Sequence, residues 1–179
     1  SREQRSQAKT VNFGIIYGVS AFGLSNQTDL SRSDAKELIE TYYATYPKLR
    51  AYVQHQVSFA RENGYVETLF KRRRYLSDIN AANAVVRSAA ERNAVNAPIQ
   101  GSAADIIKRA MLAIDRRIKA EGLKSSMLLQ VHDELVFDCP KEEIDQLTAL
   151  VKYEMQNAAQ LTVPLEVEVG FGANWFEAH

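Results

Sequence analysis

Near its start the chain reads Arg5-Ser-Gln-Ala-Lys9-Thr-Val-Asn-Phe13-Gly-Ile-Ile-Tyr17-Gly18, and this stretch predicts a helix with one distinctive face. A step of four residues advances an α-helix by about 400°, so side chains at this spacing drift only about 40° per step. Two cations one turn apart can hold a polyphosphate, and a ring one turn further on can stack on a base. The spacing therefore predicts a nucleoside triphosphate site.

The other side of this helix would carry Ala8, Val11 and Ile15, which suit packing against the body of the protein. Cations and aromatic rings at the same spacing also occur on ordinary solvated helix faces that border a core. Periodicity alone leaves both interpretations open, so the rest of the chain must decide between them.

The composition is typical of a soluble globular protein, with 46% hydrophobic and 25% charged residues among 179. A chain of this length forms one or two domains, and it contains no apolar run near the roughly 20 residues of a membrane span. The single cysteine, Cys139, cannot form an internal disulfide, so a reducing cytoplasm is the expected location. Because residue 1 is Ser rather than Met, we expect a piece cut from a longer protein.

Charge is segregated along the chain although the formal net charge is zero. Residues 48–74 hold seven cations against two acids, and residues 138–170 hold seven acids against two cations. Such segregation suggests one face for phosphates and another turned to solvent, which is weak support for a nucleic-acid partner.

Capping and turn signals predict a series of helices. Ser31 or Ser33 can begin a helix that Pro47 ends, and a second helix follows from Pro47 to about residue 62, where Asn63-Gly64 ends it. Pro98 predicts a break between helices at about 81–94 and 100–120, because proline removes a helical hydrogen bond. Further helices are expected at about 2–17 and 142–159.

Two hairpins and one further strand complete the expected elements. Residues 65–76 read as a short hairpin with a basic tip at 71–74, and residues 127–138 read as a tight hairpin. Residues 165–169 alternate between apolar and acidic side chains, which predicts a half-exposed strand. The fold class is therefore α+β, dominated by helices, with a small antiparallel sheet near the C-terminus.

The second hairpin carries His132-Asp133-Glu134 at its turn, between apolar strand arms. A single acid at a turn is usually only a turn residue, but two adjacent acids must be solvated, paired or neutralised by a metal ion. Carboxylate oxygens are hard ligands that hold Mg²⁺ while the ion also binds substrate phosphates.

These motifs together closely resemble the family A DNA polymerases, the bacterial DNA polymerase I group. The stretch from Arg5 to Gly18 is similar to their motif B, and the resemblance continues through Asn96-Ala-Pro-Ile-Gln100-Gly101 and Gln130-Val-His132-Asp133-Glu134 to Asn174-Trp175-Phe-Glu-Ala-His179. It covers essentially the whole chain. The resemblance implies an incomplete right-hand polymerase fold, with a fingers subdomain at residues 1–80 and the C-terminal part of the palm at 81–179.

The resemblance also implies roles for the residues of the first helix. Arg5 and Lys9 would hold the triphosphate, with Lys9 protonating the leaving pyrophosphate. Phe13 would stack on the incoming nucleotide, and Tyr17 would sit at the template-base position. The implied partners are dNTPs and primer-template DNA.

The same resemblance assigns the remaining candidates. Asp133 would be a metal ligand of a two-ion Mg²⁺ site and Glu134 an auxiliary catalytic acid, while His132 would lie near the primer terminus. DNA contacts would also come from Arg92, Asn96, Gln100 and Gln130, three of which (Arg92, Gln100 and Gln130) would reach minor-groove acceptors that every base pair presents alike. The spacing of Arg92, Asn96 and Gln100 alone would equally allow polar side chains that only form hydrogen bonds with exposed backbone groups at a helix end.

The chain departs from the family pattern in one respect. An Asp-Tyr-Ser-x-x-Glu-Leu-Arg strand, which supplies the second metal aspartate, would precede Arg5, and residues 1–4 do not contain it. We therefore expect a half-built metal site, no polymerisation by this chain alone, and dependence on the remainder of the polymerase chain. The alternatives are a non-catalytic DNA-binding module of the same fold and, less well supported, a small metal-dependent hydrolase built on His132 and Asp133. The oligomeric state is left open.

Overall fold

The computed structural model describes residues 2–178, with side chains described from Arg5 onward, and it divides into two compact units. The first unit ends at Ser102 and the second begins at Ala103. The predicted boundary at residue 80 lies inside the first unit, and the assignment of fingers and palm stays a prediction. The α+β class is confirmed, since helices dominate both units and each unit holds a two-stranded antiparallel sheet.

The first unit opens with three helices, α1 (Arg2–Ile16), α2 (Ala21–Ser25) and α3 (Arg32–Thr45). The predicted first helix is confirmed to within one residue. Of the two possible caps for the next long helix, Ser31 is the one used, because its hydroxyl accepts a hydrogen bond from the backbone N–H of Asp34 at 3.1 Å.

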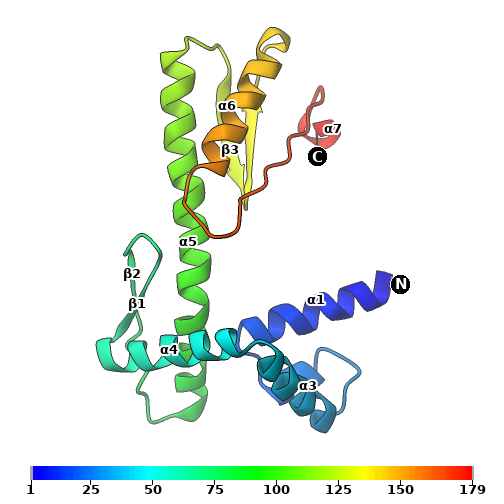
Figure 1. The fold of residues 1–179 in the computed structure, drawn as a ribbon, viewed down its shortest axis with the longest axis vertical. Coiled ribbons are helices and arrows are strands. Elements are labelled where there is room, and N and C mark those ends of the chain that lie inside the picture. Colours follow the sequence, from blue (N-terminus) through cyan, green and yellow to red (C-terminus); the bar gives the residue numbers. More distant parts are fainter. Residues whose placement is uncertain (1, 179) are drawn as a thin grey trace. The chain divides into compact units, whose positions relative to one another are not determined.

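A fourth helix leads into the first hairpin. Helix α4 (Pro47–Asn63) begins on proline and ends at Gly64, whose φ of 77° is the left-handed conformation that glycine adopts without strain. Strands β1 (Tyr65–Glu67) and β2 (Arg73–Tyr75) then pair antiparallel, with Tyr65 opposite Tyr75. Figure 1 shows this hairpin beside the first part of α5, which α4 crosses.

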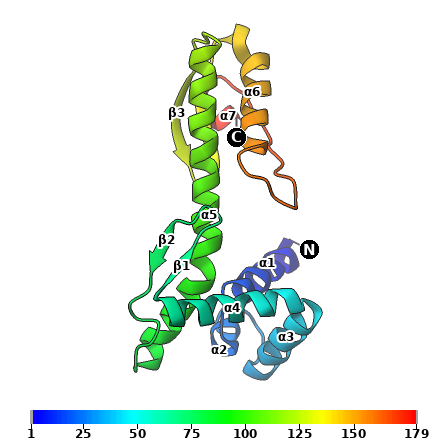
Figure 2. The same cartoon turned by 60° about the vertical axis from the view of Figure 1, so that its left-hand side comes forward.

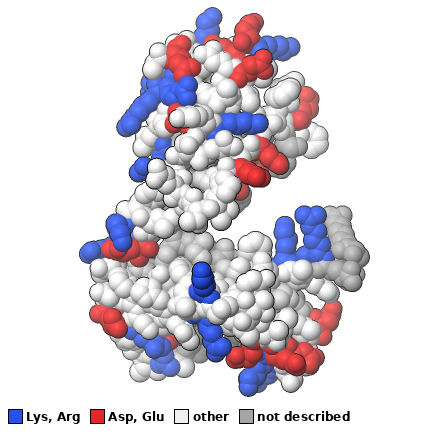
Figure 3. Space-filling model, viewed as in Figure 1, with Lys and Arg blue, Asp and Glu red and all other residues white. Residues whose placement is uncertain are grey.

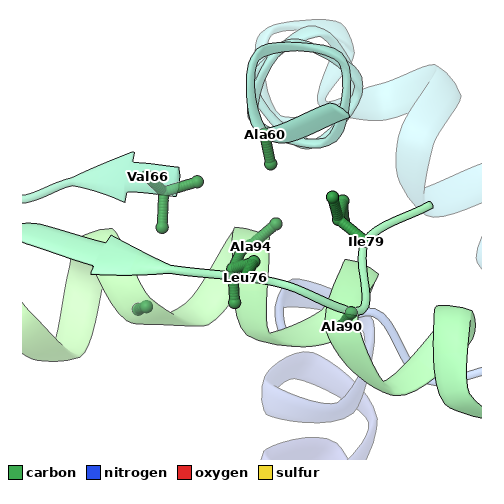
Figure 4. Packing of buried hydrophobic residues seen from close by; sticks show 7 residues of the cluster. Ala60, Val66, Leu76, Ile79, Ala90 and Ala94 are labelled. Carbon is green, nitrogen blue, oxygen red and sulfur yellow. The ribbon is translucent and has the colours of Figure 1, made fainter. Parts of the chain in front are cut away.

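The core of the first unit lies where α4, the hairpin and the first part of α5 meet (Figure 4). Small side chains let these elements approach closely, and larger apolar ones fill the remaining space. The buried cluster consists of Ala60, Val66, Leu76, Ile79, Ala90, Ala94 and Ala97.

The predicted break at Pro98 is wrong, because α5 (Ala84–Ala120) is one helix with Pro98 inside it. Proline leaves the carbonyl of the residue four positions earlier without its helical donor, which normally kinks or ends a helix. That carbonyl belongs to Ala94. Its neighbour Val95 accepts at its own carbonyl from the Tyr52 hydroxyl of α4 at 3.1 Å, and within α5 the Ser102 hydroxyl donates to the carbonyl of Pro98 at 2.5 Å, but neither bond reaches Ala94. Packing of the buried alanines around Pro98 outweighs the local preference.

The second unit is built on the second part of α5. Strands β3 (Ser126–Val131) and β4 (Glu134–Asp138) form the predicted hairpin, and α6 (Ile144–Gln156) packs beside α5 (Figure 2). A 3₁₀ turn, η1 (Lys141–Glu143), precedes α6, so the predicted helix at 142–159 is shorter at both ends. The core combines both helices with one side of the hairpin: Ala110, Ile114, Ile118, Leu147, Leu150 and Val151, with Met127, Leu135 and Phe137 packed against them.

The predicted strand at 165–169 is wrong, since these residues form no strand in the part of the chain that the structure describes. Their side chains still alternate between half-buried and exposed as far as residue 168. Alternating burial shows that the segment has one covered and one exposed face, but a β-strand also needs a neighbouring strand with which it forms hydrogen bonds. The chain then ends in a short helix, α7 (Trp175–Ala178). Within residues 2–178, no helix combines the length and apolar character of a membrane span.

Candidate nucleotide and nucleic-acid site

Helix α1 presents its predicted stripe on an exposed face. Arg5 and Lys9 are exposed, and Phe13 is 49% exposed although it is a large apolar ring. The rings of Phe13 and Tyr17 stack with centroids 6.1 Å apart and an angle of 24° between their planes. Ile15, on the other side, is 1% exposed. Of the residues expected to pack on that side, Val11 is half-buried and Ala8 is exposed, so the back of the helix is buried only near its C-terminal end. The front carries two cations, followed by two stacked rings.

Helix α3 holds α1 through two tyrosines that the sequence did not mark as important. Tyr42 and Tyr43 are half-buried, while the nearby Tyr46 is 52% exposed. Tyr42 donates a hydrogen bond to Asn12 of α1 at 2.5 Å, and Tyr43 donates to the carbonyl of Ile15 at 3.3 Å. Helical spacing indicated their common face but not these hydroxyl contacts.

The three DNA-binding candidates of α5 lie on one continuous helix, because Pro98 does not interrupt it. Arg92 lies at the end of α1, since a β-carbon built on Gly18 would be 3.6 Å from its Cγ. Asn96 has a buried Oδ1 with no hydrogen-bond partner among the described residues. Gln100 is exposed and lines a shallow cavity of about 90 Å³ against the hairpin. The structure therefore brings Arg92 beside Gly18, just after the end of α1.

The basic hairpin tip is largely paired within the protein. Glu67 accepts from Arg73 at 3.0 Å and lies 3.4 Å from Lys71, and the hydrogen bond from Arg73 keeps the pKa of the Glu67 carboxyl below its usual value. Arg72 donates to the carbonyl of Gly101 at 3.0 Å. Among the described residues of the tip, Arg74 is the one whose side chain forms neither an ion pair nor a hydrogen bond within the protein. Because these cations are paired within the protein, the hairpin tip offers less positive charge to the phosphates of a nucleic acid.

The hairpin is attached to α5 through residues that sequence reasoning missed. Ser102 accepts a hydrogen bond from the backbone N–H of Leu69 at 2.9 Å, and Gly101 lets Thr68 approach the helix closely. A glycine inside an apolar helical pattern was the available signal, since it commonly marks close approach of another segment.

In the second unit, the acidic triplet forms the turn of the β3–β4 hairpin. Val131 pairs with Glu134, so His132 and Asp133 are the two turn residues, and His132 adopts a φ of 53°. Gln130 donates from its amide to the carbonyl of His132 at 2.8 Å, which steadies the turn. His132 and Asp133 are exposed, while Glu134 is half-buried. The turn thus brings Gln130, His132 and Asp133 together and presents the aspartate to solvent.

Carboxylate oxygens at this turn suit Mg²⁺, but the described residues supply only part of an ion site. They contain no group of three histidine, cysteine or acidic side chains arranged to hold a metal ion. Asp133 would contribute a ligand with Glu134 beside it, and further oxygens would have to come from elsewhere.

On the face that Figure 3 presents, the charge segregation along the sequence does not produce a surface of one sign. Figure 3 shows basic and acidic side chains mixed on the surface that it presents in both units. Ion pairs explain much of this mixing, for example Arg61 with Glu91 at 2.6 Å in the first unit and Arg117 with Glu154 at 3.2 Å in the second.

The two units together define an α+β protein with a candidate phosphate- and base-binding helix and an acidic hairpin turn. Comparison with known proteins gives the family: the profile described as DNA polymerase family A matches residues 1–177, and the chain belongs to this family. It is 53% identical over 175 residues to DNA polymerase I of Caldicellulosiruptor bescii and 52% identical over 174 residues to that of Streptococcus pneumoniae.

Those matches include 98% and 97% of this chain, which spans only about a fifth of the length of either relative (21% and 20%). Among solved structures, the POL domain of Pol1 from M. smegmatis, in complex with DNA primer-template and dNTP, matches with a TM-score of 0.96 and 48% identity. The match covers 99% of this chain and 31% of that one.

Proposed function

We propose that this chain is part of a DNA-directed DNA polymerase and binds the incoming dNTP and the primer-template during DNA replication or repair. One observation carries the proposal: α1 exposes Arg5, Lys9 and Phe13 on one face, which suits a triphosphate followed by a base. Membership of the family and a neighbour solved with DNA primer-template and dNTP support the same function.

The proposed roles follow the chemistry of each side chain. Arg5 and Lys9 neutralise the triphosphate, and Lys9 donates a proton to the departing pyrophosphate. Phe13 stacks on the nucleotide, while Tyr17 covers the template base. Arg92, which lies at the end of α1, can then reach the nascent pair from beside Gly18.

The remaining groups act on DNA and the metal. Gln100 and Gln130 donate to minor-groove acceptors, Asn96 offers its amide to the same groove, and His132 lies near the primer terminus. Asp133 holds Mg²⁺ with Glu134 beside it, and the bound ion would stabilise negative charge on the phosphates. The rest of the polymerase chain would supply the other metal ligand, and a bacterial cytoplasm is the proposed location.

Primer extension tests this function in a full-length polymerase that contains the chain. Asp133→Asn should abolish extension and leave primer-template affinity unchanged. Asp138→Asn is the matched control, because Asp138 is an exposed aspartate at the far end of β4. Equal extension by both variants would remove Asp133 from the catalytic machinery. A polymerase that binds DNA but shows no extension even with native Asp133 would support the non-catalytic alternative.

A further inference from the structure

The orientation of α1 depends on a small number of polar contacts. The hydroxyl of Tyr42 donates to the side-chain oxygen of Asn12 at 2.5 Å, and the hydroxyl of Tyr43 donates to the carbonyl of Ile15 at 3.3 Å. Both donors belong to α3 and both acceptors to α1. The two bonds join the helices at points almost one turn apart, so together they resist rotation of α1 about its own axis.

The rings that carry these hydroxyls are held independently of them. Tyr42 packs its ring against Tyr46 with centroids 4.9 Å apart, and the guanidinium of Arg50 lies 5.9 Å from the ring centroid of Tyr43. Burial raises the pKa of both phenols, so they stay protonated donors at neutral pH. Removing one hydroxyl would therefore cut a bond to α1 without removing the ring from its place.

Asn12 occupies the flank of the stripe. It lies three residues after Lys9 and immediately before Phe13, so a helical projection places it about 60° from Lys9 and about 100° from Phe13. Its side chain is exposed, and its Oδ1 accepts a hydrogen bond from the Tyr42 hydroxyl. A bond at this position fixes the direction in which the neighbouring cation and ring project.

We propose that Tyr42 is a positioning residue for nucleotide binding: acting through Asn12, its hydroxyl sets the rotation of α1 and hence the alignment of Lys9 and Phe13 with a nucleoside triphosphate. The proposal rests on the proposed function of the stripe. Tyr43 supports the same alignment from the last turn of α1, where its target is a main-chain carbonyl rather than a side chain.

The experiment measures dNTP affinity and single-nucleotide incorporation in a full-length polymerase containing the chain. Tyr42→Phe should weaken dNTP affinity about fivefold, the size expected for one neutral hydrogen bond. The rate at saturating dNTP and the affinity for primer-template should stay at the native level. Asn12→Leu should show the same loss, and the double variant should lose no more than either single one, because both changes break one bond.

Tyr46→Phe is the matched control, since Tyr46 is the C-cap residue of the same helix and its ring lies against that of Tyr42. It should leave dNTP affinity unchanged. Native affinity in Tyr42→Phe, or additive losses in the double variant, would overturn the proposal. So would a loss in which primer-template affinity falls equally, because that pattern indicates general destabilisation.

A parallel Lys9→Ala variant separates this inference from the proposed function. If Lys9→Ala weakens dNTP binding and Tyr42→Phe does not, only the positioning role fails. If Lys9→Ala also binds dNTP normally, the stripe is not the nucleotide site and both fail.

Discussion

Thr68 and Gly101 lie so close together that a β-carbon at position 101 would sit 2.6 Å from the Cγ2 methyl of Thr68. Gly101 belongs to α5 and Thr68 follows β1, so this contact determines how near the basic hairpin comes to the helix. The hydroxyl of Thr68 is itself occupied, because it accepts from the backbone N–H groups of Phe70 and Arg72 at 3.2 Å each.

Gly101→Ala should lower the free energy of unfolding by about 1–3 kcal/mol, because overpacking exceeds the helix-propensity gain of about 1 kcal/mol. Urea unfolding of the variant measures the difference. Thr68→Ser in the same chain removes the methyl and keeps the hydroxyl, so the double variant should recover most of the loss. If it recovers nothing, the methyl contact is not the cause.

Lys71→Gly should raise the free energy of unfolding by about 0.5–1 kcal/mol. Lys71 has a φ of 67°, which costs an L-residue roughly 1–2 kcal/mol and glycine almost nothing, although glycine also gains entropy in the unfolded chain. The ion pair that it loses with Glu67 contributes little, because the lysine side chain is 80% exposed and Glu67 keeps its bond with Arg73. Lys71→Ala keeps the unfavourable backbone, so it should be less stable than the glycine variant; thermal unfolding of the two decides the matter.

Glu143→Gln should destabilise the second unit at neutral pH but not in acid. The Glu143 carboxylate accepts hydrogen bonds from the backbone N–H groups of Lys124 and Ser125 and from the Ser125 hydroxyl, and these bonds hold its pKa below the usual value. A lowered pKa adds stability above the unfolded-state pKa, and this stability is lost as pH falls through the folded-state pKa.

Thermal unfolding from pH 7 to pH 3 should therefore show the native chain and Glu143→Gln converging at the acid end. Glu142→Gln is a suitable control, because Glu142 is an exposed neighbour on the same 3₁₀ turn. A constant gap between native and Glu143→Gln chains across the whole range would mean that the negative charge does not matter.

Lys9→Ala should weaken dNTP binding at least about tenfold, the range for a hydrogen bond to a charged group. It should also slow incorporation, since the proposed proton donor is lost. Lys36→Ala on α3 removes an equally exposed lysine and should change neither quantity. Pre-steady-state incorporation over a range of dNTP concentrations separates affinity from rate, and native affinity in Lys9→Ala would refute the proposed phosphate contact.

Features set by neighbours in the sequence could be predicted, and those set by distant partners could not. The start of α3 near Ser31, the end of α4 at Gly64 and the exposed stripe of α1 depend on local backbone chemistry, and the sequence predicted them, although it left Ser31 and Ser33 as alternative caps. The course of α5 through Pro98 depends on packing against α4 and the hairpin, which no local rule contains.

The same distinction applies to the candidate site. Residue spacing predicted that Phe13 and Tyr17 would share a face, and the structure adds that their rings stack on each other. The contact of Tyr42 with Asn12 joins residues 30 positions apart, and periodicity on α3 could indicate only a packed face. Residues 165–169 show the converse: their alternating pattern does produce two unequal faces, but within residues 2–178 they pair with no strand.

The stacked pair on α1 has a thermodynamic consequence for any ligand that uses it. An exposed phenylalanine normally samples several rotamers, and a base that stacks on it must first select one. The ring of Phe13 already stacks on that of Tyr17 in the unliganded chain, so fewer side-chain rotamers are open to Phe13. A base that stacks on Phe13 would therefore bind with a smaller loss of conformational entropy, which is preorganisation built into two residues one turn apart.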